Sequence, residues 1–502
     1  MTAVTARGLT VRFPRRARPS LQGVDLDVAQ GRQHLLLGPS GAGKSTLLRV
    51  LAGVVPGTVH AEVTGAVTTA GSVGYVQQNP HDALCLPDVD SEVAFALECA
   101  GVPTAEARHR VPAALAVVGA AHLRDRDPAT LSGGEAQRVA LAAVLVGDPD
   151  VVVVDEPTAM LDPAAARSVA GLVARRGRAA VVLAEHRLDL GAPLPDTVTV
   201  LDAQGRVVAC GPTRQVLQDA HALLEAQGCW LPMSVGAAVH GHAAALALPH
   251  TYRRERRLAP GAALLVTVGT GVRSPDGVDL VRDIDLTLRA GAVTAVIGVN
   301  GAGKSTLLRA VSGVVPTTGV VRGARVAYVA QDPEHQFLGR TAGADAALGA
   351  TRDVAEVLAT FDLSDHVDRD PFRLSGGEQR RLALAGAVAS GRDVIALDEP
   401  TSGLDRRHAR AVLAAIDRHA AAGGAAILTS HDLTLVAENA DDVVVLHEGR
   451  LVARGAPDDV LHDTVLDPVG LTVPALLHAR RSAGLRADGT PARDRATMAA
   501  LP

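Results

Sequence analysis

The sequence predicts two homologous α/β domains joined in one chain. The glycine-rich stretch GPSGAGKSTLLRVLAG begins at Gly38, and GVNGAGKSTLLRAVSG begins at Gly298, 260 positions later. The apolar runs VVVVDE and DVIALDE, which follow in the two halves, are typical of parallel strands buried on both faces of a sheet. Because a repeat of this size marks a repeated structural unit, we expect each half to fold as one domain.

Length and composition agree with two ordinary domains. The chain has 502 residues, of which 47% are hydrophobic and 21% are charged. Its net charge of −5 offers no basic footprint, so no nucleic-acid partner is expected. The four cysteines form no CxxC pair, which argues against a zinc site or a disulfide framework. No stretch reaches about 18 uncharged apolar residues, so neither a signal peptide nor a membrane span is expected.

Further motifs recur in the same order in both halves. YVQQNP at Tyr75 is matched by YVAQDP at Tyr328, and LSGGEAQR at Leu131 is matched by LSGGEQRR at Leu374. The serine of LSGG precedes the glutamate of the apolar run by 24 positions in both halves. The interval from the lysine of the glycine-rich loop to the glutamine shrinks from 34 to 27, and the interval from that glutamine to the serine shrinks from 54 to 44. These intervals predict a smaller helical insertion in the second half.

Domain boundaries follow from changes in composition. The segment between the halves loses strand periodicity and carries a charge run, while the C-terminal segment is rich in Arg, Ala, Gly and Pro. The predicted parts are a first domain at 1–232, a linker at 233–261, a second domain at 262–478 and a disordered tail at 479–502. The histidines of the linker are expected to be solvated rather than to bind a metal. They are His240, His242 and His250.

The glycine-rich stretches match G-x-x-x-x-G-K-[ST], the phosphate-binding loop (P-loop) that joins an apolar strand to a helix. HLLLG and TAVIG precede the two loops, and the residues that follow have helical apolar spacing. Glycines let backbone N–H groups approach phosphates, and the helix N-terminus favours an anion. We expect Lys44 and Lys304 to bind the β- and γ-phosphates, and Ser45 and Ser305 to ligate Mg²⁺.

Each apolar run ends in an acidic pair. Asp155 and Asp398, called here the strand-end aspartates, are expected at the C-terminal edge of the sheet, where they would hold Mg²⁺ through water. Glu156 and Glu399 follow directly and are candidate general bases for the attacking water.

Together, the P-loops, LSGGE, DEPT, LD and a downstream histidine resemble the nucleotide-binding domains of ATP-binding cassette (ABC) proteins, in two copies over nearly the whole chain. The resemblance implies P-loop NTPase domains, each with a RecA-like α/β core, an antiparallel β subdomain and a helical insertion carrying LSGG. It also implies that the LSGG signature of one domain closes on the ATP held by the P-loop of the other. The chain would thus pair its domains in cis and form one motor by itself.

By this resemblance, the site residues divide by role. The implied catalytic residues are Glu156, Glu399, His186 and His431. The implied Mg²⁺ residues are Ser45, Gln78, Asp155, Ser305, Gln331 and Asp398. The implied ATP-binding residues are Phe13, Gly38, Ser40, Gly41, Gly43, Lys44, Ser45, Thr46, Gln78, Ser132, Gly133, Gly134, Gly298, Asn300, Gly301, Gly303, Lys304, Ser305, Thr306, Gln331, Ser375, Gly376 and Gly377. The D-loop residues at the interface would be Asp162 and Asp405.

The two halves differ where the family places an aromatic ring under adenine. The first half has Phe13 in VRFP, whereas the second half has Ser274 in VRSP. A serine hydroxyl cannot replace the stacking area of a ring. Arg273 could stack its guanidinium there instead. Because Ser274 replaces the ring, we expect weaker ATP binding at the second P-loop.

The stretch QNPHDALCLPDVDSEVAFALE and the motif EHRLDL resemble energy-coupling factor (ECF) importers of vitamins and metal ions. This resemblance implies an ATPase that couples hydrolysis to transport across a membrane, at whose cytoplasmic face it would sit. Its partners would be a transmembrane T component and a substrate-binding S component. The alternatives are a tandem sugar-importer ATPase and a soluble tandem ABC protein acting on ribosomes or DNA.

Overall fold

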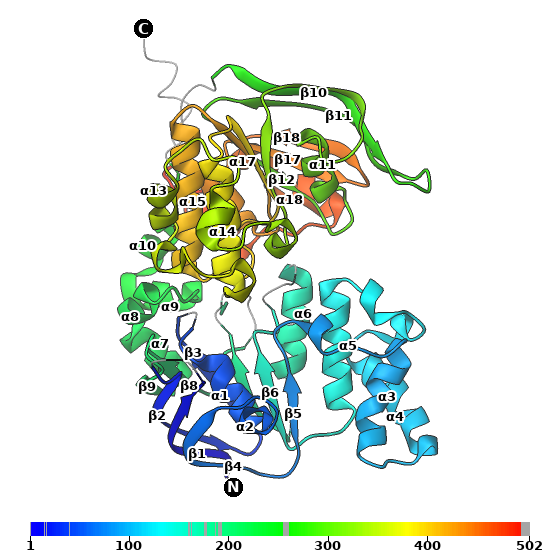
Figure 1. Cartoon of the computed structure of the whole chain (residues 1–502), viewed down its shortest axis with the longest axis vertical. Coiled ribbons are helices and arrows are strands. Elements are labelled where there is room, and N and C mark those ends of the chain that lie inside the picture. The colour runs from blue at the N-terminus through cyan, green and yellow to red at the C-terminus, as the bar shows by residue number, and fades with distance from the viewer. Residues whose placement is uncertain are drawn as a thin grey trace. The chain divides into compact units, whose positions relative to one another are not determined.

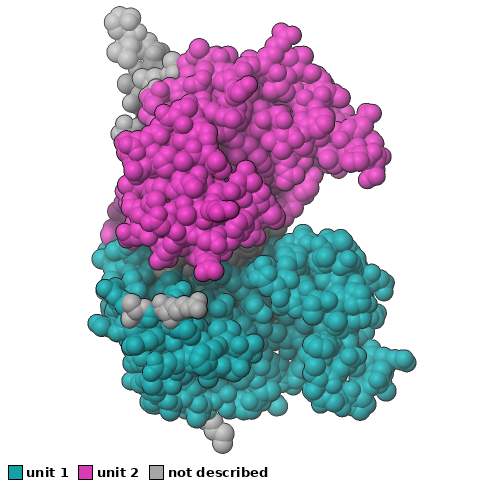
Figure 2. All heavy atoms as spheres, in the orientation of Figure 1, with its two compact units in different colours: residues 1–239 teal, residues 240–502 magenta. Residues whose placement is uncertain are grey.

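The computed structural model describes residues 2–14, 16, 18–39, 41–158, 161, 163–174, 178–185, 187–188, 193–254 and 261–492. The chain divides into two compact units, residues 1–239 and 240–502 (Figure 2). Each unit contains one copy of the repeated motifs. Among the described residues, no helix is both long and apolar enough to cross a membrane.

Unit 1 is built on a six-stranded sheet in the order β5-β6-β7-β3-β8-β9 (Figure 1). All neighbours pair in parallel except β8 and β9. Alternate residues of β6 join different hydrophobic clusters, Val151 and Val153 on one face and Val152 and Val154 on the other. The apolar run is therefore buried on both faces, as predicted. The strands are β3 Gln33–Leu37, β5 Val73–Val76, β6 Val151–Asp155, β7 Ala180–Ala184, β8 Thr197–Leu201 and β9 Val207–Pro212.

A second sheet covers one face of this core. It is antiparallel, has the order β2-β1-β4 and consists of β1 Thr2–Arg12, β2 Leu21–Ala29 and β4 Glu62–Thr69. Its apolar residues share a cluster with α1, which packs on β6 and β7. This sheet is the predicted antiparallel β subdomain.

The helices of unit 1 lie between and around these strands. Of these, α3 and α4 form the insertion that precedes the signature helix α5. The helices are α1 Lys44–Leu51, α2 Val54–Gly57, α3 Val89–Cys99, α4 Thr104–Val117, α5 Gly133–Leu145, α6 Pro163–Ala174, α7 Thr213–Asp219, α8 His221–Ala226 and α9 Met233–His240, whose last residue lies at the unit boundary.

Unit 2 repeats the plan with the central order β14-β15-β16-β12-β17-β18 and an antiparallel sheet in the order β11-β10-β13. The central strands are β12 Val293–Ile297, β14 Val326–Val329, β15 Val394–Leu397, β16 Ala425–Thr429, β17 Asp442–His447 and β18 Arg450–Gly455. The antiparallel strands are β10 Ala263–Arg273, β11 Asp279–Arg289 and β13 Thr318–Gly323.

The insertion of unit 2 is smaller, as the spacing predicts. Its helices α12 and α13 have 5 and 7 residues, against 11 and 14 for α3 and α4. The helices of unit 2 are α10 His242–Ala247, α11 Lys304–Val311, α12 Ala342–Ala346, α13 Val354–Thr360, α14 Gly376–Ala389, α15 Arg406–Ala421, α16 Leu433–Asn439, α17 Pro457–Val460, α18 Asp463–Leu466 and α19 Ala475–Ser482.

The C-terminal segment corrects one prediction. Arg480 of α19 is fully buried, and its guanidinium donates to Glu438 Oε1 at 2.7 Å and to the carbonyl oxygen of Leu246 at 3.0 Å. A buried charge requires such partners, and they lie far away in sequence, where local composition gives no signal. The prediction of a disordered tail from residue 479 is therefore wrong for residues 479–492.

The predicted linker also departs from a solvated connector. Residues 233–261 contain α9 and α10. The backbone N–H of His250 donates to Glu438 Oε1 at 2.7 Å, and Arg254, which is 4% exposed, donates to Asp417 Oδ1 at 2.7 Å. The segment around His250 and Arg254 is thus an integral part of unit 2.

Candidate functional site

Each P-loop connects a central strand to a helix that has no side-chain cap. The loop after β3 reaches α1 at Lys44, and the loop after β12 reaches α11 at Lys304. The N-cap residues Gly43 and Gly303 have φ values of 93° and 98°, and a Cβ on Gly43 would lie 2.4 Å from the carbonyl oxygen of Ser20. The glycines are therefore required by conformation and space, and the first N–H groups of each helix can bind an anion.

The P-loop lysines fold back over their own loops. Lys44 Nζ donates to the carbonyl oxygens of Gly38 at 2.9 Å and Pro39 at 3.2 Å. Lys304 Nζ donates to the carbonyl oxygens of Gly298 at 2.8 Å and Val299 at 3.0 Å. Both ammonium groups are thereby held at the centre of the loop, where phosphate oxygens would lie.

In unit 2, the strand-end aspartate has a full set of donors. Asp398 is 3% exposed, and its Oδ1 accepts from Thr429 Oγ1 at 2.7 Å and from Ser305 Oγ at 3.0 Å. Thr429 ends the neighbouring strand β16, and Ser305 lies in the first turn of α11. The predicted Mg²⁺ residues Ser305 and Asp398 are therefore in direct contact.

In unit 1, the same position is less well satisfied. Asp155 pairs in register with Ala184, which has no hydroxyl, and among the described residues its buried Oδ1 has no hydrogen-bond partner. Burial raises the pKa of Asp155 to about 6, although a hydrogen bond with Ser45 opposes this shift. An orphaned, buried carboxylate oxygen beside a serine hydroxyl is a suitable ligand set for a hard cation such as Mg²⁺.

The candidate general bases directly follow the strand-end aspartates in sequence, and their backbones are strained. Glu156 and Glu399 have φ values of 44° and 50°, which are uncommon for residues other than glycine and are often found at functional sites. Glu156 Oε2 accepts from Gln78 Nε2 at 2.8 Å, whereas Glu399 Oε2 pairs with His431 Nδ1 at 2.9 Å. Two predicted pairs of site residues are therefore brought together, one in each unit.

The environment of Glu399 favours its ionised form. Burial alone would raise the pKa of Glu399. The charges of His431, Lys304 and Arg380, together with the hydrogen bond from His431, outweigh burial and hold the pKa below its ordinary value. An ionised carboxylate at this point can accept a proton from water.

The signature sequence forms a capping box at the start of a helix. Ser132 caps α5, and its N–H donates to Glu135 Oε2 at 2.9 Å; Ser375 caps α14, and its N–H donates to Glu378 Oε2 at 2.8 Å. The two glycines between each serine and glutamate supply the first turn. They are Gly133 and Gly134 in unit 1, and Gly376 and Gly377 in unit 2.

The remaining predicted residues have varied positions. Asp405 caps α15 by accepting from the backbone N–H of His408 at 2.9 Å, and the carbonyl oxygen of Gln331 accepts from Arg380. Phe13 packs partly buried against the unit 1 core, and Ser274 Oγ closes a turn by accepting from the N–H of Val278 at 3.1 Å. Five further predicted ATP-binding residues lie in the P-loops or in the helices that follow them: Gly41, Thr46, Asn300, Gly301 and Thr306. Three lie outside the described residues: Ser40, Asp162 and His186.

Sequence reasoning missed a residue that ties the parts of unit 2 together. Arg380 of the signature helix donates to the carbonyl oxygens of Glu399 at 2.6 Å, Ser402 at 2.7 Å and Gln331 at 2.6 Å. Unit 1 has Gln137 at the matching offset from its signature serine. An arginine in LSGGEQRR against a glutamine in LSGGEAQR was the signal available in the sequence.

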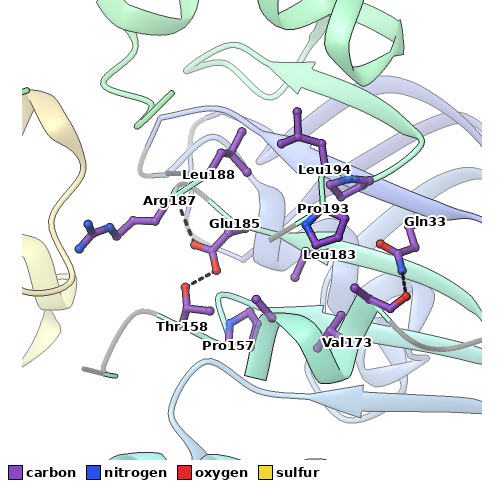
Figure 3. Close-up of a pocket in the computed structure, with 13 residues that line it drawn as sticks. Gln33, Pro157, Thr158, Val173, Leu183, Glu185, Arg187, Leu188, Pro193 and Leu194 are labelled. Atoms are coloured by element: carbon purple, nitrogen blue, oxygen red, sulfur yellow. Dashed lines mark hydrogen bonds between the residues drawn. The ribbon is translucent and has the colours of Figure 1, made fainter. Parts of the chain in front are cut away.

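Unit 1 also has an apolar pocket away from its P-loop. It lies between β7, α6 and the segment that enters β8, and Glu185 is its buried carboxylate (Figure 3). Glu185 accepts from Thr158 Oγ1 at 2.5 Å and from the N–H of Arg187 at 3.1 Å. These bonds fix the orientation of the Glu185 carboxylate in the pocket.

The fold and these two sites define a class: two P-loop domains of nucleotide hydrolases, each with an acidic pair at the end of a central strand two positions from the P-loop strand. The sequence pattern of the ABC transporter family matches residues 21–159 and 281–402. The chain belongs to this family, and it is a tandem ABC ATPase.

Relatives match nearly the whole chain. A putative HMP/thiamine import ATP-binding protein, YkoD of Bacillus subtilis, is 30% identical and covers 94% of this chain and 95% of its own length. A putative ABC transporter ATP-binding protein of Streptomyces avermitilis is 34% identical over 90% of this chain and 94% of its own.

Solved structures share the fold at lower identity. The RNase-L inhibitor is 20% identical, with a TM-score of 0.61 over 90% of this chain and 91% of its own. A chain in a model of ribosome-bound archaeal Pelota and ABCE1 is 21% identical, with a TM-score of 0.63 over 90% of this chain and 79% of its own.

This likeness corrects the partners predicted from the sequence. A chain with the same tandem fold occurs bound to a ribosome, so the fold does not imply T and S components and does not exclude a partner that contains nucleic acid. The net charge of −5 misled the prediction because an average over 502 residues does not describe any one face. The expectation of importer partners and of no nucleic acid does not stand.

Proposed function

We propose that the chain is a two-site ATP motor in which the signature of each unit closes on the ATP held by the P-loop of the other. The observation that carries the proposal is the duplication of complete halves. Each unit has a P-loop with its lysine in place, an acidic pair and an intact signature cap. Neither half has lost a hydrolytic residue, so both sites are expected to turn over.

Mg²⁺ would be held by Ser45 and Asp155 in unit 1 and by Ser305 and Asp398 in unit 2, with Gln78 and Gln331 approaching it. The orphaned oxygen of Asp155 and the contact between Ser305 and Asp398 support this assignment. The ion would neutralise charge on the phosphates, while Glu156 and Glu399 would accept a proton from the attacking water.

A double variant tests the hydrolytic assignment. Glu156→Gln with Glu399→Gln should bind ATP but lose turnover, because an amide cannot accept the proton. ATP binding and steady-state phosphate release on the full chain check both statements. Turnover near the wild-type rate would show that other groups act as bases.

The work that the motor drives has two candidates, and the first is import of a small nutrient. The name of the Bacillus subtilis relative, at 30% identity over 94% of this chain, supports this use. A second candidate is a role on ribosomes, which the ribosome-bound chain of the same fold suggests.

One fractionation separates these uses. The double glutamine variant is expressed in cells, held with ATP and sedimented through sucrose. Import predicts recovery of the chain at the cytoplasmic face of sealed membranes. The ribosomal role predicts migration with ribosomal particles that is lost after ribonuclease treatment. A chain that stays at the top of the gradient contradicts both.

A further inference from the structure

A tyrosine stands beside the acidic pair in each unit. The chain has only three tyrosines, and two of them occupy matching positions, Tyr75 on β5 and Tyr328 on β14. Tyr75 pairs in register with Val153 of β6, and Tyr328 pairs with Ala396 of β15. Each partner is two residues before a strand-end aspartate. Because side chains of a strand alternate with a period of two, each tyrosine is on the face of the sheet that carries the aspartate.

The helix after the P-loop brings a second residue to the same place. In unit 2, Ser305 and Arg309 are four residues apart on α11 and therefore share a helix face. Ser305 Oγ donates to Asp398 Oδ1 at 3.0 Å. Arg309 Nε donates to the Tyr328 hydroxyl at 3.4 Å, and that hydroxyl donates to Asp398 Oδ2 at 3.5 Å. Both carboxylate oxygens are thus held, one by serine directly and the other by arginine through tyrosine.

Unit 1 has the same residue types at the matching positions. Burial is the main cause that raises the pKa of Tyr75, the charge of Asp155 raises it further, and the charge of Arg49 lowers it. Ser45 and Arg49 again stand four residues apart on α1. The two units differ in the other partners of the acidic pair, but both place a tyrosine and an arginine near the strand-end aspartate.

We propose that Tyr75 and Tyr328 are positioning residues that fix the rotation of the strand-end aspartates for Mg²⁺, each backed by an arginine of the P-loop helix. The inference rests on the proposed Mg²⁺ sites. An arginine that donates to the phenol oxygen polarises the O–H bond and strengthens its donation to the carboxylate. A carboxylate held in one rotation presents the same oxygen to the metal in every cycle, as partners behind metal ligands generally ensure.

The third tyrosine provides a matched control. The Tyr252 hydroxyl also donates to a carboxylate, Asp417 Oδ2 at 2.7 Å. This bond joins the predicted linker, residues 233–261, to α15 and does not involve the strand-end aspartates. Tyr252→Phe removes the same group from the same kind of bond elsewhere in unit 2.

The test uses the full chain with Glu156→Gln and Glu399→Gln, loaded with ATP and freed of excess nucleotide. Mn²⁺, the probe, is titrated in and its free fraction is followed by electron paramagnetic resonance. Tyr75→Phe with Tyr328→Phe should raise the half-saturating Mn²⁺ concentration about 10-fold, while Tyr252→Phe should leave it unchanged. Arg49→Gln with Arg309→Gln, which leaves both tyrosines in place, should shift it in the same direction.

Kinetics then separates positioning from packing. With both glutamates restored, the double phenylalanine variant should lose kcat at limiting Mg²⁺ and recover it at saturating Mg²⁺. An unchanged Mn²⁺ midpoint, or a loss of kcat that Mg²⁺ does not restore, would overturn the inference. If the parent chain itself binds no Mn²⁺ with ATP, the proposed Mg²⁺ sites fail, and the inference fails with them.

Discussion

At the scale of single residues, the two strand-end aspartates show how equal motifs acquire different properties. Asp398 accepts from Thr429, whereas Asp155 faces Ala184 and keeps a buried oxygen without a partner among the described residues. The difference lies one strand away, in LTSH against LAEH. Unit 1 therefore holds a carboxylate that the described protein groups around it do not fully stabilise.

This difference predicts that Asp155→Asn stabilises the chain without nucleotide or metal. The pKa of Asp155 is raised to about 6 from 3.8, so the folded state binds the proton more tightly and the ionised carboxylate destabilises the fold above pH 6. The shift corresponds to about 3 kcal/mol at pH 7, and the cost disappears as the pH falls toward 3.8. Thermal unfolding at pH 7.5 and pH 4.5 should show a clearly larger gain at the higher pH.

The matched control is Asp398→Asn, which disturbs the bonds from Ser305 and Thr429 and should give no such gain. A stabilising effect of equal size at Asp398, or none at Asp155, would contradict this explanation. We attribute the destabilisation by Asp155 to its function, because a carboxylate oxygen without a protein partner is available to bind the cation.

A buried histidine predicts acid sensitivity of unit 1. His34 on β3 is 1% exposed, its ring nitrogens lie 2.8 Å from Thr197 Oγ1 and 3.0 Å from Thr199 Oγ1, and burial lowers its pKa to about 4. The unfolded chain takes up this proton near pH 6.5, so stability is present above that pH and is lost as the pH falls to 4, by about 3 kcal/mol. His34→Gln should flatten the unfolding free energy over this window. Parallel pH profiles for both chains would refute the assignment.

At the scale of elements, α19 is expected to be essential for unit 2. Arg480 and Glu438 form an ion pair in which both side chains are fully buried. Arg480→Met would leave the Glu438 charge buried without this partner, which should cost about 3–5 kcal/mol in urea unfolding. Arg486→Met, an exposed position near the same end, should change stability little. A loss of less than about 1 kcal/mol for Arg480→Met would show that the remaining donors to Glu438 suffice.

Local elements could be predicted from the sequence, and long-range packing could not. The P-loops, the strands before the acidic pairs and the smaller second insertion follow from short motifs and their spacing. The fold of residues 479–492 depends on Glu438, 42 positions before Arg480, which composition does not reveal. The sequence shows that Arg380 and Thr429 of the second half have no identical counterpart in the first half. Their contacts with Glu399 and Asp398 depend on how strands and helices pack, which the sequence does not show.

At the scale of the whole molecule, the duplication is the central fact. Each unit has its own P-loop and its own signature. If each unit formed a complete ATP site by itself, two units in one chain would not be needed. If the signature of each unit closes on the P-loop of the other, Lys44 and Ser375 belong to one ATP site, and Lys304 and Ser132 belong to the second. The account therefore depends on which signature serves which P-loop.

Retention of ATP after desalting, counted per chain in the Glu156→Gln and Glu399→Gln background, tests this claim most directly. Ser132→Arg places a bulky cation at the signature of unit 1. Combined with Lys304→Ala, it should damage the same site twice and leave one ATP retained; combined with Lys44→Ala, it should damage both sites and leave none. The reverse pattern, with one ATP retained by the Lys44→Ala combination and none by the Lys304→Ala combination, would show that each signature serves its own unit.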